Sequence, residues 1–388
     1  MKIAFIGQKG LPAVSGGVER HVEDLAVRLV ARGHKVIAYT RPHYTNPTLD
    51  NYKGIELISL PSVRSKSLDA ITHTFLACFA VMRQRVDIIH FHSIGPSSLV
   101  GLAKLLNPGV KIVATVHSPD YYRDKWGFFA RTYLKFGERT ACRSAHATIA
   151  ISKSLTENAE QSYGRPVSYI PNGVAIAENR EAQEIKKWGL EKDNYILSVA
   201  RLVPEKGTHD LIEAYTNLVT YKKLVIVGSG AFNETYEDYL KKLAGTNPNI
   251  IFTGNQSGDI LSELFSNAYL FAQTSELEGL SIALLEAMSY GKRILISDIP
   301  ENIEVIGHAG RTFKVKNIKD LTLQLNNCLH EGETLRELGQ AAKERVIHYY
   351  HWDMITQSIE NIYGELLTEK FNRRNNKLMM ISRFWTVV

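Results

Sequence analysis

The sequence predicts an α/β protein with two parallel-sheet domains, and three observations lead to that prediction. Short apolar runs alternate with amphipathic stretches along nearly all of the 388 residues, which is the pattern of repeated β–α–β units. Several of these runs are apolar almost throughout, as parallel strands are when helices cover both faces of their sheet. The series of strands restarts after a turn and a polar stretch between residues 171 and 194, so the chain divides into two cores.

The first half contains seven expected strands, at residues 2–7, 34–40, 55–60, 87–92, 111–117, 147–152 and 167–170. After the first strand, Val18, Val22 and Leu25 recur at three- and four-residue intervals, as on the buried face of a helix. Gly33 follows them, where a helix C-terminus favours glycine. This half is therefore predicted to be a Rossmann-like domain of residues 1–170.

The second half repeats the pattern after the turn Pro171-Asn172-Gly173. Its expected strands are residues 195–200, 224–228, 250–253, 269–274 and 293–297. We expect a second Rossmann-like domain at 171–351. The last periodic segment begins at Trp352 and has no strand after it, so residues 352–388 are expected to leave this domain as a helix with a basic tail.

The composition limits the classes of function. Hydrophobic residues make up 44% and charged residues 22%, as in globular proteins, and no apolar run reaches the ~18 residues of a membrane span. The three cysteines, Cys78, Cys142 and Cys328, are far apart, which is typical of a reduced compartment. The net charge of +6 suits anionic partners without specifying nucleic acid. We therefore expect a cytoplasmic protein with no nucleic-acid partner.

A glycine pair follows the first strand and opens the first helix. Gly16 and Gly17 allow close backbone approach, and a helix N-terminus offers free N–H groups to an anion. The loop suits a diphosphate or a sugar hydroxyl. The alternative is a plain strand–helix turn, because the segment matches neither the dinucleotide fingerprint nor a P-loop.

Two cations follow the first strand of the second half. Arg201 and Lys206 lie just past the carboxyl end of that strand, where open α/β sheets bind ligands. There they would neutralise a diphosphate as its bond to a sugar breaks. The alternative is a solvated charged loop.

The next candidate segment begins and ends with a carboxylate, at Glu278 and at Glu286. Glu278 is expected in a loop before a helix that Ser281 can cap, with Glu286 in the second turn of that helix. The pair can then face one cleft, one carboxylate near a reacting sugar and the other near a ribose. The alternative is two surface glutamates, and Glu276 adds a further negative charge.

His117 ends an otherwise apolar strand, and His90 and His92 end the strand before it. A neutral imidazole can hydrogen-bond a sugar hydroxyl. Because no cysteine, carboxylate or H-x3-H spacing accompanies these histidines, we expect no metal site. His90 also fits a histidine in the core.

In this order, the segments resemble the retaining GT-B glycosyltransferases of family 4, the glycosyl transferases group 1 set. The segments that carry the resemblance are Glu278–Glu286, Arg201 with Lys206, Gly16-Gly17, Pro171-Asn172-Gly173 and Phe252-Thr253-Gly254. It implies two Rossmann-like domains whose parallel sheets face each other across a cleft. It also implies that the C-terminal helix crosses back to the N-terminal, acceptor-binding domain.

The resemblance further implies a role for each candidate residue. Arg201 and Lys206 would hold the diphosphate, Glu278 would contact the transferred sugar, and the fourth catalytic residue, His117, would contact the donor sugar. The residues expected to bind phosphate, sugar, ribose or base are Gly16, Gly17, Gly279, Leu280, Glu286, Phe252 and Gly254.

The implied reaction moves a hexose from a nucleotide diphosphate sugar, UDP- or GDP-linked, to a saccharide or lipid-linked saccharide, with retention of configuration. The implied setting is bacterial capsule, O-antigen or exopolysaccharide biosynthesis. Because no Asp-x-Asp signature occurs, Arg201 and Lys206 would replace a divalent ion, and no metal or other cofactor is expected. The alternatives are a sugar-nucleotide epimerase, a soluble-acceptor synthase and a non-catalytic nucleotide-sugar binder.

Two segments of the first half, residues 64–85 and 121–139, are both cationic and rich in aromatic or apolar residues. Such helices suit a membrane interface that carries anionic lipid, although the aromatic side chains alternatively face the core. We expect peripheral association with the cytoplasmic face of the inner membrane, and the tail 373–385 agrees with it.

Overall fold

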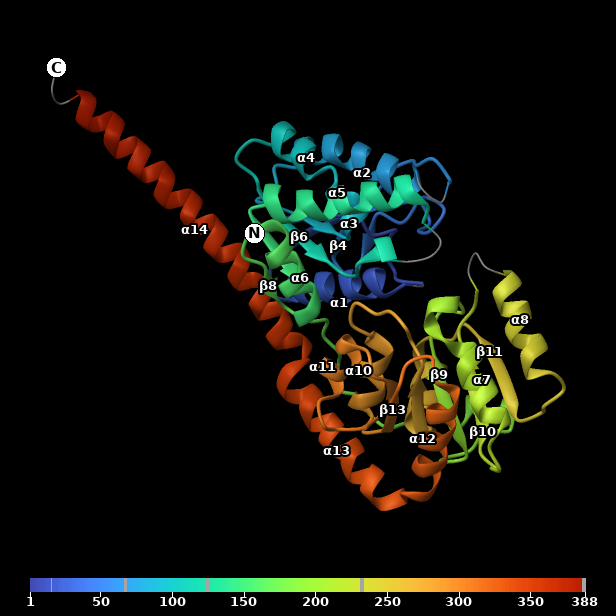
Figure 1. The fold of residues 1–388 in the computed structure, drawn as a ribbon. Coiled ribbons are helices and arrows are strands. Elements are labelled where there is room, and N and C mark those ends of the chain that lie inside the picture. Colours follow the sequence, from blue (N-terminus) through green and yellow to red (C-terminus); the bar gives the residue numbers. More distant parts are fainter. Residues whose placement is uncertain (15, 66–67, 123–125, 231–233, 386–388) are drawn as a thin grey trace. The chain divides into compact units, whose positions relative to one another are not determined.

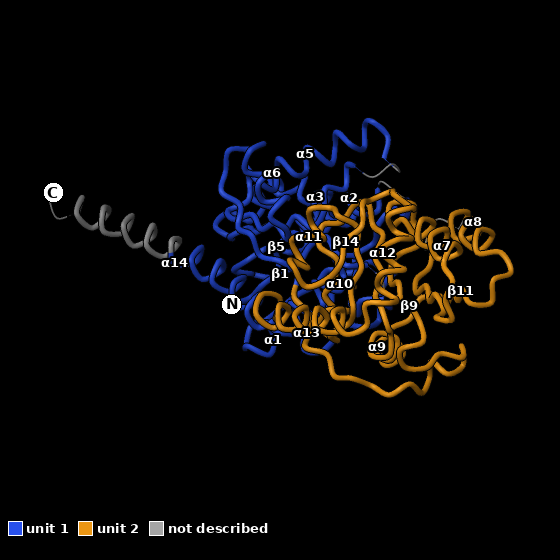
Figure 2. The backbone as a smooth tube through the Cα atoms, turned by 60° about the horizontal axis from the view of Figure 1, so that its bottom comes forward, with its two compact units in different colours: residues 1–172, 352–388 blue, residues 173–351 orange. Residues whose placement is uncertain are grey.

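The computed structural model describes the chain apart from residues 15, 66–67, 123–125, 231–233 and 386–388, and apart from the side chains of residues 234 and 369–388. Residues 123–125 of the predicted basic segment and the side chains of the predicted tail therefore lie outside this description. The chain forms two compact units, residues 1–172 with 352–388 and residues 173–351 (Figure 2). Each unit contains a sheet of mainly parallel strands between helices, so the predicted α/β class with two parallel-sheet domains is confirmed.

Unit 1 contains an eight-stranded sheet in the order β3-β4-β2-β1-β5-β6-β7-β8. The strands are β1 (Lys2–Ile6), β2 (Lys35–Thr40), β3 (Asn51–Tyr52), β4 (Ile55–Ser59), β5 (Ile88–His92), β6 (Lys111–Val116), β7 (Ala147–Ala150) and β8 (Ser168–Tyr169). Neighbouring strands are parallel except for β3, which pairs antiparallel with β4. Lys53 and Gly54 join these two strands, both with positive φ, which is the geometry of a two-residue hairpin turn.

Helices cover both faces of this sheet (Figure 1). They are α1 (Gly17–Ala31), α2 (Leu68–Ala80), α3 (Ile94–Ser97), α4 (Val100–Leu106), α5 (Phe128–Ser144), α6 (Lys153–Tyr163) and α14 (Trp352–Trp385), with 3-10 turns at Val81–Arg83 and Asp120–Tyr122. Val22 of α1 and Ile355 of α14 share one buried cluster with Phe5 of β1. The last helix is therefore part of the core of unit 1, although unit 2 separates it in the sequence from the rest of unit 1.

Unit 2 contains a six-stranded parallel sheet in the order β11-β10-β9-β12-β13-β14. The strands are β9 (Tyr195–Val199), β10 (Lys223–Val227), β11 (Ile250–Gly254), β12 (Leu270–Gln273), β13 (Arg293–Ser297) and β14 (Arg311–Phe313). The helices are α7 (Thr208–Thr216), α8 (Glu234–Ala244), α9 (Gly258–Asn267), α10 (Ile282–Ser289), α11 (Pro300–Ile306), α12 (Ile318–His330) and α13 (Gly332–Tyr349), with 3-10 turns at Glu184–Trp188 and Pro204–Lys206.

The strand order of unit 2 reverses between β9 and β12. β10 and β11 continue on one side of this pair, and β13 and β14 on the other. Open α/β sheets bind ligands at the carboxyl ends of the two strands where the order reverses. The segments that leave those two ends are residues 200–207 and 274–281, which contain most of the candidate residues of this unit.

No helix of the described residues combines the length and the apolar character that crossing a membrane requires.

Candidate functional site

The loops that follow β9 and β12 are fastened to each other by hydrogen bonds. The backbone N–H of Glu276 donates to the carbonyl of Glu205 at 2.9 Å. The buried Thr274 hydroxyl lies 3.0 Å from the carbonyl oxygen of Lys206 and 2.8 Å from that of Gly207. Gly207 has φ +61°, and a Cβ at this position would overlap the carbonyl oxygen of Thr274. The two loops therefore act as one structure, and glycine is required where they touch.

Lys206 and Glu278 project from these two loops and meet. Lys206 Nζ lies 2.5 Å from Glu278 Oε1, and the two side chains are only 13% and 11% exposed. A charge-assisted bond between largely buried groups holds both side chains in one place. Arg201 lies on the same loop as Lys206 and is exposed. The structure thus joins one predicted cation to one predicted carboxylate at the reversal of strand order.

A buried polar network supports the Glu278 loop from below. Ser281 caps α10, as predicted, by accepting from the N–H of Leu284, and its hydroxyl donates to Gln273 Oε1 at 2.6 Å. The Gln273 amide donates to Asn302 Oδ1 at 2.9 Å, and Asn302 donates to the hydroxyl of Ser297 at 3.0 Å. Fully satisfied buried networks restrict a structure to one arrangement, so the position of the Glu278 loop is fixed by α10 and α11.

The remaining candidates of this loop lie on and before α10. Gly279 and Leu280 are buried, and Glu286 is half-buried. Glu286 follows Ser281 by five residues, about 7.5 Å along the helix axis at ~1.5 Å per residue. It lies one turn before Tyr290, whose ring stacks on Phe265 of α9. The ribose role of Glu286 stays a prediction.

Glu276 lies on the same loop as Glu278 and pairs with a different lysine. Its carboxylate pairs with Lys316 Nζ at 2.7 Å, and Lys316 lies outside the two fastened loops. Glu276 also lies close to His209 and Asp210. The ligand atoms of these three residues are all within 4.8 Å of one another. Burial raises the pKa of Asp210, and the charge of Glu276 adds to that rise. The Nδ1 atom of His209 lies 2.8 Å from the Tyr236 hydroxyl, so this ring nitrogen already has a hydrogen-bond partner within the protein.

The backbone after β10 contacts the loop that follows β9 and the last residue of β11. No role for this loop was predicted from the sequence. Gly228 donates to the carbonyl of Gly254 at 2.9 Å. Its φ is +142°, and a Cβ there would overlap the Ala200 carbonyl oxygen. A Gly-Ser-Gly run after a strand was the signal that could have found this loop. Phe252 is partly buried and packs against the core of unit 2, and its base-flanking role stays a prediction.

Three buried histidines meet at the carboxyl ends of β5 and β6 in unit 1. His92 Nδ1 lies 3.1 Å from His117 Nε2, and the ring of His21, from α1, lies 4.8 Å from that of His117. Burial lowers the pKa of His21 to about 4 and the pKa values of His92 and His117 well below their usual range. All three rings are therefore neutral near pH 7. His90 bonds Tyr363 and Thr115 at 2.6 and 2.7 Å, as a core histidine does.

The pairing fixes the proton of His117. Within the described residues, the buried Nε2 of His92 has no hydrogen-bond partner. A buried N–H without an acceptor is rarer in proteins than an under-used acceptor. We therefore assign the proton of His92 to Nδ1, which donates to Nε2 of His117. His117 then carries its own proton on Nδ1, so Nδ1 is the donor that this ring can offer to a sugar hydroxyl.

The same three rings are the candidate metal ligands of unit 1. Their ligand atoms lie within 4.8 Å of one another, and Zn–N distances of ~2.0–2.1 Å place tetrahedral ligand nitrogens about 3.3 Å apart. The hydrogen bond between His92 and His117 already uses two of the nitrogens. A metal would have to break that bond, and the expected absence of a metal stays a prediction.

The N-terminus of α1 carries a carboxylate of its own. Gly16 is the N-cap, with φ +104°. Glu19 is buried, accepts from the N–H of Lys9 at 3.1 Å, and would overlap a Cβ at Gly16. This carboxylate lies against Gly16, one of the two glycines predicted to meet a donor phosphate. The phosphate contacts of Gly16 and Gly17 stay predictions.

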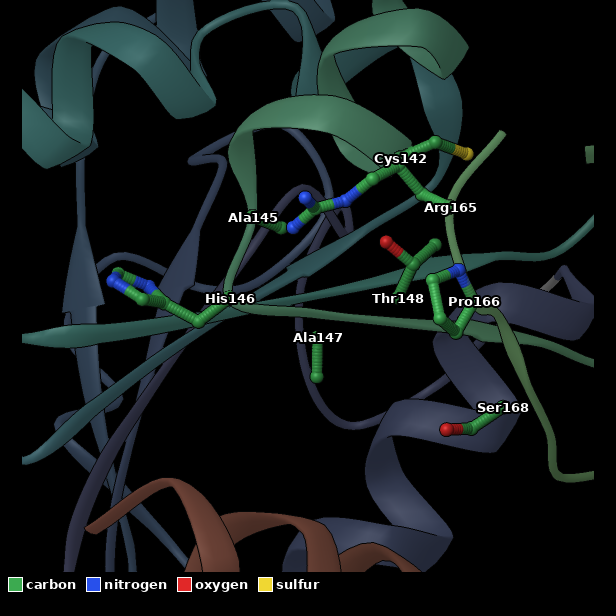
Figure 3. A pocket seen from close by; sticks show the side chains of 8 residues that line it. All are labelled: Cys142, Ala145, His146, Ala147, Thr148, Arg165, Pro166 and Ser168. Carbon is green, nitrogen blue, oxygen red and sulfur yellow. The ribbon is translucent and has the colours of Figure 1, made fainter. Parts of the chain in front are cut away.

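Unit 1 also contains a pocket that none of the candidate residues lines (Figure 3). It is lined by Cys142, Ala145, His146, Ala147, Thr148, Arg165, Pro166 and Ser168. Ala147 and Ser168 are the first residues of β7 and β8. The pocket is therefore at the amino ends of these strands, the edge opposite to the one that binds ligands in open α/β sheets.

Comparison with known proteins places the chain in a family. It matches the model of Glycosyltransferase Family 4 over residues 15–178 and that of Glycosyl transferases group 1 over residues 180–345. It is 27% identical to the uncharacterized glycosyltransferase MJ1607 of Methanocaldococcus jannaschii, and the match covers 94% of this chain and 98% of that protein.

Solved structures agree on the fold. Sucrose-phosphate synthase from Thermosynechococcus elongatus superposes with a TM-score of 0.80 at 20% identity, over 95% of this chain and 99% of that chain. Anabaena Alr3699/HepE in complex with UDP-glucose superposes with a TM-score of 0.78 at 20% identity, over 95% of this chain and 100% of that chain. With both halves matched by family models, the chain belongs to the GT-B glycosyltransferases, in the families Glycosyltransferase Family 4 and Glycosyl transferases group 1.

Proposed function

We propose that this glycosyltransferase moves a hexose from a nucleotide diphosphate sugar to a saccharide or lipid-linked saccharide, with retention of configuration, in bacterial polysaccharide biosynthesis. The observation that carries the proposal is the Lys206–Glu278 pair, held at the reversal of strand order by two fastened loops. The complex of Anabaena HepE with UDP-glucose supports a UDP-linked donor, with a GDP-linked donor as the alternative.

In the proposed mechanism, Lys206 and Arg201 neutralise the diphosphate as it leaves the sugar. Charge stabilisation by groups that are already in position needs no reorganisation during the reaction. The hydrogen bonds between the loops and the network beneath Glu278 provide that order. Because the two cations supply the positive charge, we propose that transfer needs no metal. The roles of His117, Gly16 and Gly17 in unit 1 stay those that the resemblance predicts.

The donor is found first, by thermal denaturation with a panel of UDP-, GDP-, dTDP- and ADP-sugars, since a ligand of the native state raises the melting temperature. Turnover is then measured with lipid-linked and free saccharides as acceptors. Nucleotide release that no acceptor stimulates would instead support an epimerase, and donor binding without any release would support a non-catalytic binder.

Lys206→Ala tests the assigned site. We expect turnover to fall roughly 10²-fold or more, the scale of a lost transition-state contact, while circular dichroism shows that the fold stays intact. Lys242→Ala, at an exposed lysine of α8, is the matched control and should leave turnover unchanged. Wild-type turnover in Lys206→Ala contradicts the proposed role, and inhibition by a chelator that Mn²⁺ or Mg²⁺ reverses contradicts metal independence.

A further inference from the structure

One surface of unit 1 exposes many large apolar side chains. Of the twenty-one that are exposed in the described part of the chain, eleven lie between residues 63 and 136. They are Val63, Leu68, Phe75, Leu76, Phe79, Met82, Leu105, Tyr122, Phe128, Phe129 and Phe136. Most lie on α2, α4 and α5, and we call this surface the α2–α5 face. Concentrated exposed apolar side chains mark an interaction site on a soluble domain.

The three helices form one layer. α4 packs against both α2 and α5, and the three lie together on the same side of the sheet of unit 1 (Figure 1). Phe75 and Phe79 of α2 are in ring contact at 5.1 Å. Phe128 and Phe129, at the start of α5, are 79% and 88% exposed. The predicted alternative, in which the aromatic side chains face the core, is therefore wrong for these four residues.

Within the described part of residues 61–144, the exposed charged side chains all have one sign. They are Arg64, Arg83, Arg85, Lys104, Arg131, Lys135, Arg139 and Arg143. Four of them follow each other at four-residue intervals along α5. Two acidic residues of this stretch have partners within the domain: Asp69 pairs with Arg41 at 2.6 Å, and buried Glu138 accepts from the Tyr163 hydroxyl at 2.8 Å.

We propose that the α2–α5 face docks on a bilayer that contains anionic lipid. Phenylalanines would enter the boundary between headgroups and acyl chains, while the row of bases on α5 would meet the lipid phosphates. A second copy of the chain is a poor occupant, because a symmetric dimer through this face would set the two basic rows against each other. The inference deepens the proposed function, since it gives the surface where a lipid-linked acceptor is met.

Flotation of the full-length protein with vesicles tests the proposal without any transfer reaction. The probes are vesicles of phosphatidylcholine alone and of phosphatidylcholine with phosphatidylglycerol. We expect binding only to the anionic vesicles, and weaker binding as salt is raised. The double variant Phe128→Ser/Phe129→Ser should bind about 100-fold more weakly, at roughly 10-fold for each phenylalanine removed from a membrane. Arg131→Gln/Lys135→Gln should lose roughly 5-fold for each charge.

The matched control is Leu323→Ser/Tyr349→Ser, which removes two exposed apolar side chains of unit 2 and should bind vesicles as wild type does. Melting temperatures with and without the donor nucleotide show that each variant is folded and keeps its donor site. If wild type and both face variants bind vesicles equally, the proposal is overturned. This is the result expected if the C-terminal tail carries the binding instead. A dimer in sedimentation velocity that Phe128→Ser/Phe129→Ser abolishes, with no vesicle binding, also overturns it. Loss of transfer with intact vesicle binding would count against the proposed function alone.

Discussion

Mild acid should unfold unit 1, because it buries five histidines in their neutral form. They are His21, His73, His90, His92 and His117. Burial lowers the pKa of His21 to about 4, of His73 to about 4 and of His90 to about 3, and it lowers the other two well below the usual range. In the unfolded chain each histidine returns to a pKa of about 6.5.

The sign of the effect follows from proton binding. Below pH 6.5 the unfolded chain binds more protons than the folded chain, so the free energy of unfolding falls with pH. The contribution of these groups is complete above about pH 6.5 and is lost as the pH drops toward 4. Each group costs about 1.4 kcal/mol per pH unit in that window, so five cost about 7 kcal/mol per unit. Because a domain has only about 5–15 kcal/mol of stability, unit 1 should unfold within about two pH units below pH 6.5.

Urea titrations at pH 7.5, 6.5 and 5.5 measure this loss, and hydrogen exchange with mass spectrometry assigns it to unit 1 or unit 2. His73→Met should reduce the slope of unfolding free energy against pH by about 1.4 kcal/mol per unit. His348→Met, at an exposed histidine of α13, should leave the slope as in wild type. A urea midpoint that stays constant from pH 7.5 to 5.5, or an identical slope in His73→Met, would refute the reasoning.

Four further substitutions probe the candidate site. His92→Phe should change the ¹⁵N chemical shifts of the His117 ring as its tautomers redistribute, and unchanged shifts would argue against the assigned proton. Gly207→Ala should lower the free energy of unfolding by about 1–3 kcal/mol, because this backbone conformation is strained for alanine; urea titration would show a wild-type value if the loops can move apart. Asn302→Ala should lower the free energy of unfolding by about 1–3 kcal/mol, because it leaves buried polar groups unpartnered, and it should also lower turnover. A loss of stability with unchanged turnover would mean that the network does not position Glu278. Glu278→Gln should lower turnover without weakening the binding of free nucleotide diphosphate in calorimetry, and weaker binding would contradict the exchange of partners argued below.

Most strands could be predicted because their sequences are apolar on both faces. β1 (Lys2–Ile6) and β10 (Lys223–Val227) are buried along almost their whole length, so a short apolar run is sufficient evidence for each. β3 (Asn51–Tyr52) and β14 (Arg311–Phe313) were missed. They are edge strands of two and three residues, too short to show any periodicity.

The candidate site was predictable only where a strand end marks it. Lys206 and Glu278 each follow a recognisable strand, and parallel strands bring their carboxyl ends to one edge. His21 could not be found this way, because it lies inside α1 and only the packing of that helix brings it to His117. The hydroxyl of Thr274 is similar: its bonds to the β9 loop depend on β9 and β12 being neighbours.

If the proposed site is correct, we expect the Lys206–Glu278 pair to link donor binding and catalysis. The carboxylate neutralises a lysine that is only 13% exposed, which offsets part of the cost of removing its charge from water. A diphosphate brings more negative charge than one carboxylate, so Lys206 is expected to exchange Glu278 for phosphate when the donor enters. Glu278 would then be free to accept from a hydroxyl of the transferred sugar. Because the network through Ser281 and Gln273 keeps the loop in place, this exchange needs only side-chain rotation, and the site can form its donor contacts without unfastening the two loops.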